Sequence, residues 1–281
     1  MKRAVFFGAG QIGAMTVRLA GAEYIPLCFA DNYEPKWGFH LAGLPVMSPA
    51  EALSLRPDSV FLCVLDCERA GQMEDQLRSM GYSGEIVRPD ALETFDPRYA
   101  MMRLLAEQIN AQSIPGDAAE LGVYKGAFAA RINAAFPDRT LHLFDTFEGF
   151  AEVDLEAERQ GKLSKAKTGD FSDTSAEIVR QALPHPEKVV FYKGFFPETF
   201  SACRAECFAF VSIDADLYAP TSAALPVFWE RLSRGGVLMI HDVNSTQFSG
   251  VKKAVDEFCG EKSILPMPVC DLHGSVILRK N

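Results

Sequence analysis

Side chains that bind metal ions or carry protons follow two apolar stretches in the second half of the chain. Asp214 and Asp216 follow one stretch, and His241 and Asp242 follow the other. If the two stretches are neighbouring strands of a parallel sheet, both ends open into the same crevice and these side chains share one rim. Carboxylates that lie so close repel one another, so a divalent cation such as Mg²⁺ or Mn²⁺ is the economical explanation. The alternative is that one aspartate caps a helix while the others are solvated.

A glycine motif of the form E-x-G-x-x-x-G precedes these residues and begins at Glu120 and Gly122. The backbone of such a turn can lie against the amino-acid part of S-adenosylmethionine (SAM). A carboxylate at the end of the following strand can bind the ribose diol, and Asp145 stands at that position. The predicted SAM-binding residues are therefore Glu120, Gly122, Tyr124, Asp145 and Thr146.

A separate glycine motif, Gly8-x-Gly10-x-x-Gly13, follows an apolar run near the start of the chain, and Asp31 closes the next run. In a nucleotide-binding turn these glycines allow the tight bend, the approach of a pyrophosphate and the packing of helix on strand, while the carboxylate binds ribose. This pattern predicts a possible nucleotide at Gly8, Gly10, Gly13 and Asp31. The alternative is that the glycines serve only close packing, because about 95 residues hold little more than half of a complete dinucleotide-binding domain.

Strands and helices must alternate to position these motifs, and the apolar periodicity predicts that they do. The chain changes character near residues 88–97, where prolines stand at both ends of a segment without a clear period. We therefore expect two α/β domains, a Rossmann-like βαβ module over 1–95 and a larger unit over 96–281. The polar segment 146–170 is a long excursion from the strand pattern, and residues 152–167 within it are expected to form a solvated flap. The strands expected in the second unit cover residues 118–123, 141–144, 189–192, 208–213, 237–240 and 275–278.

Composition excludes several classes of function. The 281 residues carry 28 Lys+Arg against 37 Asp+Glu, a net charge of −9, which disfavours nucleic acid as a partner. No apolar run approaches the roughly 18 residues of a membrane-spanning helix, so no membrane partner is expected. Seven cysteines and no recognisable leader indicate reduced thiols in a cytoplasmic protein. The expected partner is a small molecule or glycan, and the sequence is compatible with a homo-oligomer.

The second unit resembles the TylF (macrocin) O-methyltransferase family, over about residue 115 to the end of the chain. The matching segments occur in the family's order and spacing. They are Glu120–Val123, Leu143–Phe150, Gly169–Phe171, Lys193–Thr199, Asp214–Tyr218 and Gly250–Phe258. The resemblance implies a class I SAM-methyltransferase fold, a doubly wound sheet whose last strand is antiparallel. It also implies a SAM-dependent O-methyltransferase that acts on a sugar hydroxyl of a glycan, nucleotide sugar or glycosylated metabolite, with a divalent metal assisting.

The resemblance also assigns roles to individual residues. Glu120 and Gly122 become part of the SAM-binding turn, and Asp145 becomes the ribose carboxylate. Asp214 and Asp242 become metal ligands, with Asp214 also the catalytic base. Where the family has two adjacent acids this chain has His241-Asp242, so His241 is a further candidate for metal ligand and for base.

Two other functions are compatible with parts of the sequence. The chain could be a non-catalytic nucleotide or nucleotide-sugar binding protein that uses its first module. An NAD-dependent oxidoreductase is a third reading, but the sequence has no Tyr-x-x-x-Lys signature in the required register.

Overall fold

The computed structural model describes residues 2–20, 24–88 and 97–281. The chain divides into two compact units: residues 1–96 with 270–273, and residues 97–269 with 274–281. The boundary predicted at residue 95 lies outside the described residues. Among the described helices, none combines the length and apolar character that crossing a membrane requires.

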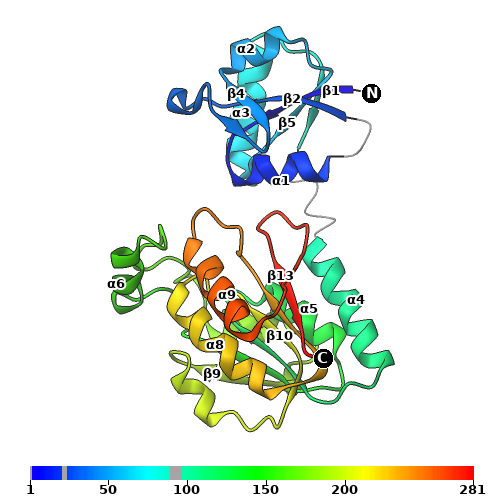
Figure 1. Cartoon of the computed structure of the whole chain (residues 1–281), viewed down its shortest axis with the longest axis vertical. Coiled ribbons are helices and arrows are strands. Elements are labelled where there is room, and N and C mark those ends of the chain that lie inside the picture. The colour runs from blue at the N-terminus through cyan, green and yellow to red at the C-terminus, as the bar shows by residue number, and fades with distance from the viewer. Residues whose placement is uncertain (1, 21–23, 89–96) are drawn as a thin grey trace. The chain divides into compact units, whose positions relative to one another are not determined.

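The first unit contains a six-stranded sheet in the described residues, with the order β3-β4-β2-β1-β5-β6 (Figure 1). All its pairings are parallel except that of β3 with β4. Its strands are β1 (Lys2–Phe7), β2 (Tyr24–Ala30), β3 (His40–Leu41), β4 (Leu44–Met47), β5 (Ser59–Leu62) and β6 (Glu85–Val87), and its helices are α1 (Gln11–Leu19), α2 (Pro49–Ser54) and α3 (Cys67–Ser79). The sequence predicts four of these strands, including β6, and the sheet is larger than that because β3 and β4 are too short to show a period in the sequence.

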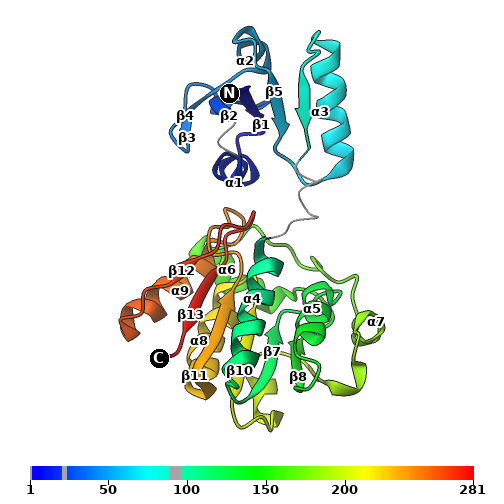
Figure 2. The ribbon, with the colours of Figure 1, turned by 90° about the vertical axis from the view of Figure 1, so that its right-hand side faces the viewer.

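The second unit contains a seven-stranded sheet with the order β12-β13-β11-β10-β7-β8-β9 (Figure 2). The last strand, β13, runs antiparallel to β11, which confirms the predicted class of fold. The strands are β7 (Asp117–Leu121), β8 (Leu141–Asp145), β9 (Val189–Lys193), β10 (Phe208–Ile213), β11 (Leu232–Ile240), β12 (Met267–Pro268) and β13 (Val276–Arg279). The helices are α4 (Pro97–Ala111), α5 (Ala127–Ala135), α6 (Glu152–Gly161), α7 (Ala176–Ala182), α8 (Tyr218–Arg231) and α9 (Ser249–Lys262).

Successive residues of the central strand β10 face opposite layers of helices. Val211 packs in the cluster that includes α8 and α9, while Phe210 packs in the cluster that includes α4 and α5. Every residue of β10 is buried, as expected for a parallel strand covered on both faces. Its last residue, Ile213, pairs with Leu121 on one side and with Ile240 on the other. This register places the residues that follow all three strands at one edge of the sheet.

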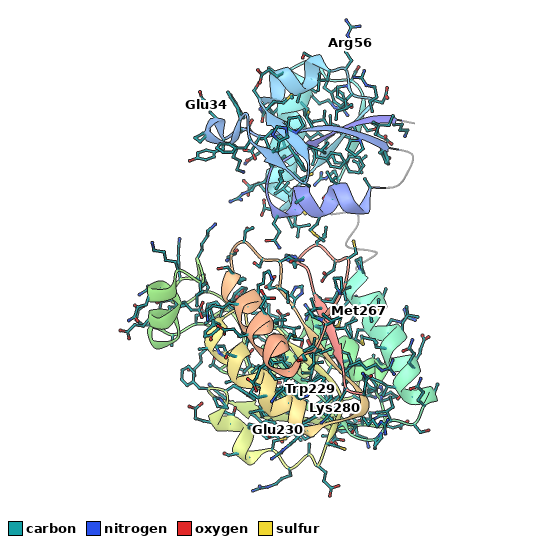
Figure 3. The ribbon with its side chains drawn as sticks, in the orientation of Figure 1. Glu34, Arg56, Trp229, Glu230, Met267 and Lys280 are labelled. Atoms are coloured by element: carbon teal, nitrogen blue, oxygen red, sulfur yellow. The ribbon has the colours of Figure 1, made fainter. Side chains whose placement is uncertain are left out.

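The C-terminal end of helix α8 is capped by a lysine that lies far along the chain. Lys280 Nζ donates hydrogen bonds to the carbonyl oxygens of Trp229 at 2.7 Å and Glu230 at 3.0 Å (Figure 3). A cation at this end of a helix also interacts favourably with the helix dipole.

Residues 152–167, within the segment 146–170, differ from the expected solvated flap. They contain helix α6, in which Leu155 and Glu158 are buried, although Glu152 and Glu156 are exposed. The high content of charged residues in this segment hid the buried positions from the sequence argument.

Candidate active site

The predicted SAM-binding turn is built against the end of β10. Gly122 has φ +81°, and a Cβ atom there would lie 1.9 Å from the carbonyl oxygen of Asp214, so only glycine fits. The Val123 and Tyr124 amides donate to Asp145 Oδ2 at 2.6 and 3.1 Å. The structure therefore brings together the glycine turn and the strand-end carboxylate that the sequence paired.

The two other residues predicted at this turn make local contacts. Tyr124 is 37% exposed, and its hydroxyl donates to Asp173 Oδ1 at 2.7 Å. Thr146 Oγ1 donates to the carbonyl oxygen of Gly149 at 3.2 Å. Tyr124 presents exposed surface beside the turn, while the Thr146 hydroxyl is used to shape the loop after β8.

Glu120 is the most deeply buried of the predicted residues, at 1% exposure. Burial raises its pKa well above the ordinary value; Arg98 opposes this rise, and the negative charges of Asp214 and Asp145 add to it. Its Oε2 atom has no hydrogen-bond partner among the described residues. A buried polar atom of this kind calls for a partner, and the polar amino-acid part of SAM would supply one, so these residues fit the cofactor.

Three carboxylates form a group at the rim: Asp214, Asp216 and Asp242 each offer an oxygen within 4.8 Å of the others. Asp216 and Asp242 have φ values of +59° and +58°, an uncommon conformation that aspartate tolerates better than most residues. Burial raises the pKa of Asp216 well above its usual range, and the charges of Asp214 and Asp242 raise it further. Hard oxygen donors that repel one another suit Mg²⁺ or Mn²⁺, so the residues present fit such an ion.

Among the described residues, Asp242 belongs to two groups of side chains that could hold a metal ion, one with Asp214 and Asp216 and one that includes His241. The predicted ligands Asp214, His241 and Asp242 are thus divided between these two groups, and His241 stays a predicted ligand. Its Nδ1 atom lies 2.9 Å from the Ser275 hydroxyl, toward β13. The physical reason is the sheet: Ile240 is paired on one side with Ile213 and on the other with Val276. In the group that contains Asp214, the third carboxylate is that of Asp216.

Arg98 is a site residue that sequence reasoning missed. Its Nη1 donates to Asp214 Oδ2 at 3.0 Å and its Nη2 to Ser212 Oγ at 3.3 Å. The guanidinium lies 3.9 Å from the centroid of the Phe128 ring, and the residue is 7% exposed. The sequence did contain an indication of this role. Arg98 precedes Met102 by four residues, the spacing of one helix face, and both lie on the buried face of α4.

The glycine motif of the first unit is tightly packed. Gly8 has φ +116°, with its Cβ position 2.8 Å from the Cys63 carbonyl oxygen, and that of Gly13 lies 2.2 Å from the Gly8 carbonyl oxygen. At Gly10 a Cβ would meet nothing within 4 Å. Asp31 Oδ2 accepts from the Ala9 amide and from Lys36 Nζ, each at 2.8 Å. These contacts favour the packing interpretation for Gly8 and Gly13.

The similarity to known proteins extends over the second unit and the end of the first. The family model described as macrocin-O-methyltransferase (TylF) matches residues 73–280. The 8-demethyl-8-(2,3-dimethoxy-alpha-L-rhamnosyl)-tetracenomycin-C 4'-O-methyltransferase of Streptomyces olivaceus is 27% identical over 185 residues, 62% of this chain and 69% of that protein. The demethyldecarbamoylnovobiocin O-methyltransferase of Streptomyces niveus is 26% identical over 171 residues, 57% of this chain and 64% of that protein.

Solved structures show the same fold. The O-methyltransferase NovP superposes with a TM-score of 0.56 at 24% identity, covering 66% of this chain and 80% of its own. The calicheamicin methyltransferase CalS11 gives a TM-score of 0.52 at 22% identity, covering 64% and 77%. At these identities the likeness concerns the fold of the second unit.

Proposed function

Because the chain belongs to the macrocin O-methyltransferase (TylF) family and is a SAM-dependent O-methyltransferase, we propose that it methylates a sugar hydroxyl with the help of a divalent cation. The acceptor is a glycan, a nucleotide sugar or a glycosylated metabolite. One relative supports this class of acceptor, since its name describes a rhamnosyl-bearing tetracenomycin.

The observation that carries the proposal is the group of three carboxylates beside the SAM turn. Gly122 packs against the backbone of Asp214, so the cofactor turn and the acidic rim are adjacent parts of one structure. Asp214, Asp216 and Asp242 would hold the cation, which supplies Lewis acidity to neighbouring sugar hydroxyls. Burial is the main cause of the raised pKa of Asp216, and the negative charges of Asp214 and Asp242, which a cation would offset, raise it further.

The chain's own residues bind the cofactor and move one proton. Asp145 keeps the turn closed and would bind the ribose, while Glu120 would offer its buried carboxyl to the amino-acid part of SAM. Asp214 accepts the proton of the sugar hydroxyl, and its ion pair with Arg98 at 3.0 Å holds the side chain in place. His241 is the second candidate base. The oxygen of the acceptor forms its bond to the methyl carbon as the carbon–sulfur bond breaks, and S-adenosylhomocysteine (SAH) is released.

Methyl transfer from labelled SAM to a panel of nucleotide sugars and glycosylated metabolites, with Mg²⁺, Mn²⁺ or chelator, tests the proposal. We expect transfer that chelator abolishes, and a loss of at least about 100-fold in Asp214→Asn. His241→Asn separates the two candidate bases, and Asp138→Asn, an exposed acid, is the control. SAH binding without transfer to any glycosylated acceptor would overturn the choice of acceptor.

Family membership is inconsistent with the alternative that the chain is a non-catalytic binding protein. Nucleotide binding by the first unit is a separate matter and stays a prediction, as does a homo-oligomer.

A further inference from the structure

One buried carboxylate of the second unit lies outside the rim described above. Glu158 belongs to α6 and is 1% exposed, whereas Glu156 and Arg159 on the same helix are exposed. A glutamate is rarely buried to this extent unless it has a partner that compensates for lost hydration. The sequence gives no sign that Glu158 is buried, because the residues around it are mostly charged.

The partner of Glu158 is the N-terminus of α8. The N-cap residue there is Leu217, which has no side chain that could accept a hydrogen bond, and the first turn of α8 carries no acid. Glu158 Oε1 accepts from the Tyr218 amide at 2.7 Å. Burial raises the pKa of Glu158, and the Tyr218 and Ala219 amides oppose that rise. A residue from α6 thus supplies the cap that α8 lacks in its own sequence.

The capped N-terminus of α8 comes directly after the acidic rim in the sequence. Asp216, one of the three clustered carboxylates, precedes Tyr218 by two residues. Asp216 has φ +59°, and the Leu217 amide donates to the Ala215 carbonyl at 2.6 Å, so the connection is a tight turn with little slack. The Tyr218 amide therefore follows directly on the turn that sets the backbone of Asp216.

A third helix closes this junction. A Cβ on Gly250 of α9 would lie 2.8 Å from Tyr218 Cβ and 3.1 Å from Glu158 Oε2, so α9 packs against both. The Gly250 amide donates to the Leu163 carbonyl at 2.9 Å, just after α6. Glu158 thus lies where α6, α8 and α9 meet, and α6 and α8 are neighbours in the fold (Figure 1).

We propose that Glu158 is a positioning residue for methyl transfer, which caps α8 from the excursion helix α6 and thereby holds Asp216 within the carboxylate group. The geometry of the rim then depends on the docking of α6. The inference rests on the O-methyltransferase activity and on the rim, and it does not depend on which acceptor is used.

Helix α8 offers a matched control, because both of its ends are capped from elsewhere in the chain. Glu158→Ala removes the cap at the end beside Asp216, and Lys280→Met removes the cap at the opposite end. If Glu158 only stabilised the helix, the two changes would have similar consequences. If it positions Asp216, only Glu158→Ala affects catalysis.

The experiment compares these two variants with Glu158→Gln and with Glu156→Ala, an exposed position on α6. For Glu158→Ala we expect kcat to fall at least about tenfold with SAH affinity unchanged, since small misplacements of a catalytic group are costly. Glu158→Gln, whose amide oxygen can accept from the Tyr218 amide, should restore most of the rate. Lys280→Met should lower the melting temperature and leave kcat unchanged.

Amide hydrogen exchange of the peptide covering residues 214–219 gives a readout that needs no acceptor. Glu158→Ala should speed exchange there about fivefold, the effect of losing a helix cap, while Lys280→Met leaves it unchanged. Unaltered exchange and kcat in Glu158→Ala, or equal losses of kcat in Glu158→Ala and Lys280→Met, would overturn the proposal. A wild-type chain inactive on every sugar would instead contradict the proposed acceptor and leave the exchange comparison intact.

Discussion

The two units begin with the same backbone arrangement and differ in the side chain that completes it. In each, a glycine follows the first strand and packs against the carbonyl of the residue just after a neighbouring strand: Gly8 against Cys63, and Gly122 against Asp214. The amides of Cys63 and Asp214 donate to the first strand at 2.7 and 2.8 Å. In both units the aspartate closing the second strand accepts from an amide of the glycine turn.

The difference lies in charge. In the first unit the residue after the neighbouring strand is Cys63, whose pKa burial raises to about 12, so the thiol is neutral. The negative charge of Asp31 is compensated there by an ion pair with Lys36, whose Nζ lies 2.8 Å from Asp31 Oδ2. In the second unit that residue is Asp214, and it stands in a group with two further carboxylates. A Rossmann-like turn is thus a scaffold, and chemistry depends on what the adjacent strand ends supply.

Among the described glycines, the largest effects are expected at the two where an added Cβ would lie nearest to another atom. Gly122→Ala would place that atom 1.9 Å from the Asp214 carbonyl oxygen, and Gly13→Ala would place it 2.2 Å from that of Gly8. Each should destabilise its own unit by at least about 3 kcal/mol. Calorimetric unfolding and SAH titration of the full chain should show that only Gly122→Ala abolishes SAH binding. Loss of SAH binding in Gly13→Ala would break the distinction between the units.

The two strand-end aspartates allow the same chemical change in each unit. Asp145→Asn weakens the bonds from the Val123 and Tyr124 amides and removes the proposed ribose carboxylate. We expect SAH affinity to fall roughly 30-fold, about 2 kcal/mol, as for hydrogen bonds to charged groups. Asp31→Asn should leave SAH affinity unchanged in the same titration. Equal losses in both variants would contradict the assignment of SAM to the second unit.

Gly10 sharpens the comparison because it is the open position of the first motif. Its φ and ψ of −129° and −165° are accessible to alanine, and a Cβ would meet nothing within 4 Å. Gly10→Ala should therefore change stability by less than about 1 kcal/mol. Titration of the wild type with NAD and with UDP-glucose should give heat if the first unit binds a nucleotide, and none if its glycines serve only packing. A binding signal that Gly10→Ala removes would establish a nucleotide site there.

The smallest effect concerns the Asp31–Lys36 ion pair and depends on pH. Burial opposes ionisation of Asp31, but Lys36 and the Tyr33 and Ala9 amides hold its pKa below the usual value. Stability from this group is present above the unfolded pKa of about 3.9 and is lost as pH falls through the lower folded value. Lys36→Met should cost less than about 1 kcal/mol at neutral pH and nothing near pH 2, measured by urea unfolding. A cost that did not vary with pH would indicate lost packing instead.

The sequence predicted the elements that carry a strong apolar signal. Strand β10, wholly buried, and the antiparallel end of the sheet were both expected from the residues and the family resemblance. The expected solvated flap was wrong at Glu158, because a glutamate is assigned to solvent unless a distant amide is known to meet it. The sequence did not show that Asp242 would be shared between one group of possible ligands with Asp214 and Asp216 and another that includes His241, since the direction of a side chain after a strand depends on its neighbours.

What the sequence by itself determined is the order of strands, turns and acids, since glycine spacing and apolar period are local properties of the chain. It also determined the family, through motifs spread over the second unit. Only the tertiary structure decided which acids meet. Arg98 reaches Asp214 across 116 positions of sequence, and Glu158 reaches Tyr218 across 60. Such contacts depend on how helices pack on the sheet, and no local pattern encodes the partner of a buried charge.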